Sequence, residues 1–172
     1  MSNPRPNNCL ILIFGASGDL TKRKLIPALY DLYVDNQMPA DFSVLGISRR
    51  SMSDDAFRDH LHEFSHHFSQ SFDEARWGDF ARHVYYQAAD STRSEDYLEI
   101  KKRMGELTQT HQTGENVLFY LAMAPQLYDA TIVQINEHQM VTEGKAWCSI
   151  NRLRRPWQRL IVEKPFGHDA PS

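Results

Sequence analysis

The feature that most constrains the fold is an unbroken apolar run, Cys9–Phe14, which ends at the turn Gly15-Ala16-Ser17-Gly18. A run that is apolar at every position predicts a strand buried on both faces, as in a parallel sheet covered by helices. Beyond the turn, the spacing of apolar residues over 20–33 predicts a helix, in which Pro27 requires a kink or a late start. The chain therefore begins with a strand, a glycine turn and a helix.

The same alternation continues along the chain. Further strands are predicted at 42–47, 83–88, 116–122 and 158–163. Further helices are predicted from a serine cap at Ser51 or Ser53 to about Phe68, and at 72–82, 94–107 and 125–140. In the helix over 94–107 we expect Tyr97, Leu98 and Met104 to face inward. Strands and helices that alternate in this way are typical of an α/β domain with a parallel sheet.

Composition excludes several classes of protein. The chain has 172 residues, of which 41% are hydrophobic and 24% charged, with a formal net charge of −3. These values exclude wholesale disorder, collagen and coiled coils, and the acidic balance argues against a general nucleic-acid binder. No apolar stretch reaches the ~18 residues that a membrane span needs, and the amino terminus lacks the apolar core of a signal peptide. We therefore expect a cytoplasmic protein that binds neither membrane nor nucleic acid.

The glycine turn is the first candidate site. It follows a predicted strand and precedes a predicted helix, which is the context that a dinucleotide fingerprint requires. Gly15 is suited to a tight turn, and Gly18 lets the backbone approach a pyrophosphate at the positive end of the helix. The spacing is GxxG rather than GxGxxG, so a structural turn without a ligand is the alternative interpretation.

The end of the second strand carries the basic sequence Ser48-Arg49-Arg50. Enzymes that use NAD usually have an acidic residue there, which binds the ribose 2′-hydroxyl. An arginine instead presents a fork of donors that matches a phosphate. This pattern predicts NADP rather than NAD, and the alternative is a solvated loop that happens to be basic.

Histidines suggest a second kind of site. His60, His62, His66 and His67 occur with Glu63, and positions 62 and 66 lie one helical turn apart, as in zinc-binding helices. No third, distant ligand is evident. The polar face of an amphipathic helix is the favoured interpretation, and we predict no metal site.

Three motifs in order resemble those of glucose-6-phosphate dehydrogenases. They are the turn with the first part of its helix (15–25), the strand and turn at 116–125, and Glu163-Lys164-Pro165-Phe166-Gly167. The resemblance covers most of positions 9–168. It implies a Rossmann-like, doubly wound parallel sheet and the NADP-dependent oxidation of D-glucose 6-phosphate to 6-phosphoglucono-1,5-lactone. The implied domains are an NADP-binding domain at 1–168 and, at 169–172, the start of a missing carboxyl-terminal α+β domain.

The resemblance also implies a role for each matching residue. The residues expected to wrap the cofactor pyrophosphate are Gly15, Ala16, Ser17, Gly18, Asp19, Leu20, Thr21 and Lys22. Arg49 is expected to hold the adenosine 2′-phosphate, Asp90 and Ser91 to approach the adenosine, and Tyr128 to contact the coenzyme. Lys164 matches a catalytic lysine that hydrogen-bonds both the sugar phosphate and the nicotinamide.

Two neighbours of Lys164 and the end of the chain complete these expectations. Glu163 is expected to orient Lys164, and Pro165 matches a proline that is often cis in the family. The stretch 143–155 looks longer than the family usually has. The family's Asp-His-Tyr segment, with the histidine base, falls beyond Ser172.

From the missing base we expect weak NADP binding and no turnover by the chain alone. We expect a homo-oligomer only where the carboxyl-terminal domain is present. A non-catalytic NADP-binding or interaction module is the alternative.

Overall fold

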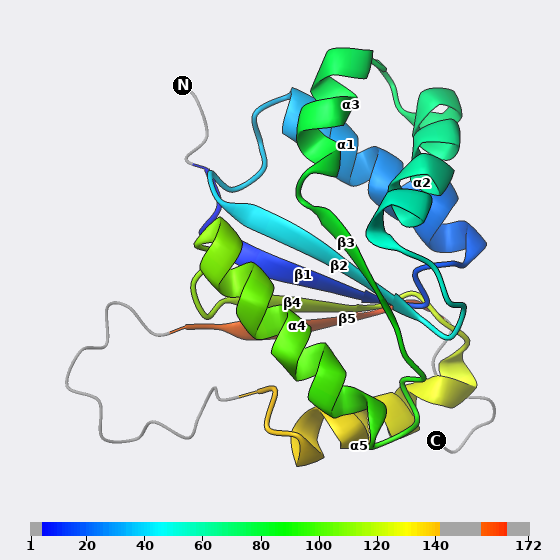
Figure 1. Cartoon of the computed structure of the whole chain (residues 1–172), viewed down its shortest axis with the longest axis vertical. Helices are drawn as coiled ribbons and strands as arrows, with labels where there is room; N and C mark the ends of the chain where they lie inside the picture. The colour runs from blue at the N-terminus through cyan, green and yellow to red at the C-terminus, as the bar shows by residue number, and fades with distance from the viewer. Residues whose placement is uncertain (1–4, 142–155, 165–172) are drawn as a thin grey trace.

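The computed structural model describes residues 5–141 and 156–164 of the chain. Its centre is a five-stranded parallel sheet in the order β3-β2-β1-β4-β5 (Figure 1). The strands are β1 (Cys9–Phe14), β2 (Phe42–Ser48), β3 (Val84–Ala88), β4 (Val117–Leu121) and β5 (Gln158–Val162). The chain runs outward from β1 to β3, and then crosses to β4 and β5 on the other side. This confirms the predicted Rossmann-like α/β sheet.

Helices cover both faces of the sheet (Figure 1). One face packs against α1 (Ile26–Val34), α2 (Asp54–Phe68) and α3 (Glu74–Ala81), and the other against α4 (Asp96–His111) and α5 (Tyr128–Glu137). Every residue of β1 is buried, because its side chains alternate between the two cores. Ile11 and Ile13 belong to the first core, and Leu10, Leu12 and Phe14 to the second.

The helix predicted over 20–33 is interrupted near Pro27: helical backbone starts at Asp19, but the regular α-helix α1 begins only at Ile26. A π-helical turn, η1 (Thr21–Leu25), precedes α1, and Pro27 occupies one of the first two positions of α1. Proline has no backbone N–H and its ring would clash with the carbonyl four residues earlier in a regular helix. The regular α-helical bonding pattern is interrupted by η1, just before Pro27.

The other helix ends also have local causes. Ser53, one of the two expected caps, accepts a hydrogen bond from the Ala56 amide at 3.1 Å. The helix expected over 125–140 begins as a 3₁₀ turn, η2 (Pro125–Leu127), and its α-helical part ends at Glu137.

The predicted inward face of α4 is wrong at one position. Leu98 is 67% exposed, whereas Tyr97, Ile100 and Leu107 are buried and Met104 packs against their core. Residues three or four apart share a helix face, and Leu98 lies about 100° around the helix from Tyr97. The Tyr97 ring, which stacks on Phe14 with centroids 6.4 Å apart, therefore determines which side of α4 is buried.

Some predicted features lie outside the described residues. They are the long stretch at 143–155, the motif residues Pro165, Phe166 and Gly167, and the domain boundary at 168–169. None of the described helices is long and apolar enough to cross a membrane.

Gly46, in the middle of β2, offers a test of this packing. A Cβ at Gly46 would lie 2.7 Å from Phe57 Cζ and 2.8 Å from Ala16 Cβ. We expect Gly46→Ala to lower the free energy of unfolding by about 1–3 kcal/mol in urea titrations, because the site is overpacked. In the control Gly78→Ala, no described group lies within 4 Å of the added Cβ in α3. It should raise stability by about 0.5–1 kcal/mol, and a similar change in both variants would contradict the close packing at Gly46.

Candidate functional site

The residues singled out from the sequence meet at one edge of the sheet. Gly15 follows β1, Arg49 follows β2, Asp90 comes shortly after β3, and Lys164 shortly after β5. Because all strands are parallel, these positions lie at the same, carboxyl, edge. Open α/β sheets bind ligands at this edge where the strand order reverses, which here is between β1 and β4.

Gly15 turns the chain sharply out of β1. Its φ is +85°, and its amide donates to the Ile47 carbonyl at 2.9 Å. A Cβ at this position would lie 2.3 Å from the Ala122 carbonyl oxygen. Both the left-handed conformation and this close approach require glycine. The turn is thereby held against the ends of β2 and β4.

The carbonyl of Gly15 closes the turn onto the helix that follows. It accepts from the Gly18 amide at 2.9 Å and from the hydroxyl of the buried Thr21 at 3.3 Å. Asp19 and Leu20 have helical backbone and stand at the start of this helical segment. The first amides of a helix have no intrahelical acceptor, so they form a partly positive end that attracts an anion.

Most side chains of the turn point away from such an anion. Ala16 and Thr21 are buried, and Leu20 packs against the core. Lys22 Nζ lies 2.8 Å from Asp19 Oδ1, and this hydrogen bond is the main reason that the pKa of Asp19 is lowered. The same ammonium lies 4.9 Å from the centroid of the Phe64 ring. Contact of this turn with a pyrophosphate stays a prediction, which these side-chain contacts leave to the backbone and Ser17.

The loop that follows β2 and carries Arg49 and Arg50, here called the arginine loop, exposes both arginine side chains. Within the described part of the chain, no side chain or carbonyl forms a hydrogen bond or ion pair with the Arg49 guanidinium. That guanidinium contributes to lowering the pKa of Asp90, although Thr92 is the main cause. The Asp90 carboxylate accepts from the Thr92 amide at 3.0 Å and from its hydroxyl at 2.7 Å. The Asp90 carboxylate is therefore charged and bonded to Thr92, and it forms no hydrogen bond with the Arg49 guanidinium in the described residues.

Ser91 is held within the second core. Its hydroxyl accepts from Thr131 Oγ1 at 3.0 Å, and its carbonyl accepts from the Tyr97 hydroxyl at 2.8 Å. Contact of Ser91 with an adenosine stays a prediction.

Two tyrosines hold the segment before Lys164. The Tyr120 hydroxyl donates to the Glu163 carboxylate, and the Tyr128 hydroxyl donates to the Glu163 carbonyl at 3.4 Å. Burial, together with the bond to Glu163, raises the pKa of Tyr120 to about 12. Lys164 itself is exposed. Glu163 is thus bonded to Tyr120, which sequence reasoning missed, and its expected effect on Lys164 stays a prediction.

The α2 histidines do not gather into a metal site in the described residues. His62 Nε2 lies 2.8 Å from Glu74 Oε2, which pairs α2 with α3. No group of three or more His, Cys, Asp or Glu side chains is placed to hold a metal ion in residues 5–141 and 156–164.

Comparison with known proteins decides the family. The model of the glucose-6-phosphate dehydrogenase NAD binding domain matches residues 12–172. The chain belongs to the glucose-6-phosphate dehydrogenase family. Glucose-6-phosphate 1-dehydrogenase of Aggregatibacter actinomycetemcomitans is 41% identical over 98% of this chain and 32% of the relative. That of Bacillus subtilis is 37% identical over 99% of the chain and 32% of the relative.

A solved structure agrees. A glucose-6-phosphate dehydrogenase in complex with its substrate glucose-6-phosphate superposes with a TM-score of 0.78 and 32% identity. The match covers 98% of this chain and 33% of that chain. The chain thus spans about a third of the length of the relatives that it matches. The predicted family is confirmed, and the matched model is that of an NAD binding domain.

Tyr120 offers a spectroscopic test of the site. We titrate the absorbance at 295 nm of the wild type and of Tyr120→Phe and subtract one curve from the other. We expect the difference to show the ionisation of one phenol, with a pKa of about 12. An ordinary tyrosine ionises near pH ~10. Far-UV circular dichroism establishes the pH range over which both proteins stay folded. If the folded Tyr120→Phe variant lacks an ionisation near pH ~10 that the wild type shows, Tyr120 ionises like an ordinary tyrosine, which would contradict its buried bond to Glu163.

Proposed function

We propose that this chain is the coenzyme-binding portion of an enzyme that oxidises D-glucose 6-phosphate to 6-phosphoglucono-1,5-lactone. NADP, when bound, supplies the hydride acceptor. The observation that carries the proposal is the shared carboxyl edge of the sheet. There the Gly15 turn, the Arg49 loop and Lys164 lie together in a chain of this family. A cytoplasmic location is part of the proposal, supported by the free, buried thiol of Cys9.

The glycine turn fits a pyrophosphate. An added Cβ at Gly18 would meet only the Gly15 and Ala122 carbonyl oxygens, at 3.1 and 3.9 Å, so the space over Gly18 is otherwise open among the described residues. Backbone and phosphate can approach closely there, and the start of the helix adds partial positive charge. The turn binds the coenzyme through its backbone and through Ser17.

The arginine loop fits the 2′-phosphate that distinguishes NADP from NAD. A guanidinium binds a phosphate through two parallel hydrogen bonds, and the fork of Arg49 is not used elsewhere in the described structure. The residue beside it at the end of β2 is Ser48, so no carboxylate on this strand repels the phosphate.

Lys164 positions the reacting groups. Its ammonium donates hydrogen bonds and has no free acceptor, so it orients the sugar and the nicotinamide and does not take the proton of the C1 hydroxyl. Tyr120 and Tyr128 fix Glu163, and with it the direction in which the backbone enters Lys164. The proton goes to a separate base, which the family resemblance assigns to an Asp-His-Tyr segment.

Titration calorimetry of the chain with NADP and NAD tests the coenzyme site. We expect tighter binding of NADP, and we expect Arg49→Ala to weaken it about 10- to 150-fold, because a charge-assisted bond to phosphate contributes about 1.5–3 kcal/mol. Binding of NAD should change little, since NAD has no 2′-phosphate.

The matched control is Arg82→Ala. Arg82 is exposed, ends α3 and pairs with Asp79, so its loss should leave both affinities unchanged. Absence of NADP binding by the wild-type chain would contradict the proposal. An equal loss of NADP and NAD affinity in Arg49→Ala would contradict the role assigned to that arginine.

A further inference from the structure

The loop that carries Arg49 is held on both sides by one phenol. Tyr86 Oη donates to the Arg50 carbonyl at 2.5 Å, and it also lies 3.2 Å from the Ser48 carbonyl. Ser48 and Arg50 are the chain neighbours of Arg49. Tyr86 therefore fixes the backbone immediately before and after Arg49, and it leaves the guanidinium free.

The same phenol is linked to the glycine turn. Ser48 Oγ lies 2.7 Å from Tyr86 Oη and 3.0 Å from Ser17 Oγ. Each hydroxyl has one proton, so while Tyr86 donates to the Arg50 carbonyl, Ser48 donates either to Tyr86 Oη or to Ser17 Oγ. Ser17 lies in the turn between Gly15 and Gly18. When Ser17 accepts this bond, its own hydroxyl proton is available for a further acceptor, such as a phosphate oxygen. A continuous row of hydroxyls thus joins the turn to the arginine loop.

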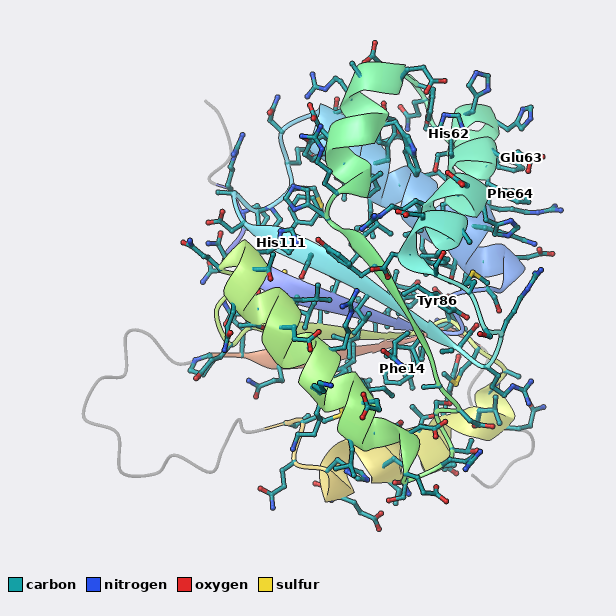
Figure 2. All side chains as sticks on the ribbon, viewed as in Figure 1. Phe14, His62, Glu63, Phe64, Tyr86 and His111 are labelled. Carbon is teal, nitrogen blue, oxygen red and sulfur yellow. The ribbon has the colours of Figure 1, made fainter. Side chains whose placement is uncertain are left out.

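Tyr86 is itself held in place by burial, by a ring contact and by a backbone hydrogen bond. It is 5% exposed, its ring centroid lies 4.8 Å from that of Phe57, and its amide donates to Asp54 Oδ1 at 2.7 Å. It lies in the middle of β3, where it pairs with Gly46 of β2, two residues before Ser48 (Figure 2). Burial raises the pKa of the phenol, so it remains a hydrogen-bond donor at neutral pH.

We propose that Tyr86 is a positioning residue that favours NADP over NAD, by fixing Arg49 at a set distance from the Ser17 turn. The inference rests on the proposed NADP site. In NADP the pyrophosphate and the 2′-phosphate are attached to the same ribose, so the distance between them is limited and both must meet their partners at once. Loosening the loop lowers the affinity for NADP. It leaves the affinity for NAD unchanged, because NAD does not use Arg49.

The test compares two neighbouring tyrosines in the whole chain. Tyr86→Phe removes the phenol oxygen and keeps the ring. The control is Tyr85→Phe, which removes a hydroxyl that lies 2.7 Å from His111 Nε2. His111 is the last residue of α4 and lies toward the other end of the sheet (Figure 2). By calorimetry we expect Tyr86→Phe to weaken NADP about three- to tenfold and to change NAD affinity by less than about twofold. Tyr85→Phe should change neither.

Amide hydrogen exchange of residues 48–51 without coenzyme gives a second readout that does not depend on NADP. We expect faster exchange in Tyr86→Phe and wild-type exchange in Tyr85→Phe. Unchanged exchange, or an equal loss of NADP and NAD affinity, would overturn the inference. Absence of NADP binding in the wild type would overturn coenzyme selection together with the proposed site, while the exchange data would still decide whether Tyr86 holds the loop.

Discussion

The site depends on the close approach of the Gly15 backbone to Ala122. Only a residue without a Cβ can take a φ of +85° with the Ala122 carbonyl oxygen 2.3 Å from the Cβ position. From this point the Gly15 amide reaches β2 through Ile47, and its carbonyl accepts from Gly18 and Thr21. One residue, Gly15, thus links the ends of three strands to the start of the first helix.

The second part of the site is organised by hydroxyl groups rather than by charge. The chain carries a net charge of −3, yet the guanidinium of Arg49 is available to a phosphate because its neighbours are bonded elsewhere. Asp90 is bonded to Thr92, and Ser48 links Tyr86 with Ser17. Local bonding, more than total charge, determines where an anion is attracted.

The sequence predicted the elements well, because each depends on local pattern. The apolar run of β1, the Ser53 cap and the interruption of the first helix before Pro27 all depend on residues a few positions apart. Leu98 was misplaced because the buried side of a helix is decided by packing against Phe14. The bonds of Tyr86 to Ser48 and of Tyr120 to Glu163 join residues 38 and 43 positions apart. No local spacing signals such contacts. The role of Lys164 came from family resemblance, whereas Ser48-Arg49-Arg50 pointed to a phosphate from the residues alone.

A crystal structure of the chain with NADP bound tests the central claim most directly. The account predicts the pyrophosphate against the backbone of Gly15 to Leu20 and the 2′-phosphate on the guanidinium of Arg49. It also predicts that the Tyr86 hydroxyl keeps its bond to the Arg50 carbonyl. A coenzyme bound with its 2′-phosphate away from Arg49, or with its pyrophosphate away from the Gly15 turn, would contradict it.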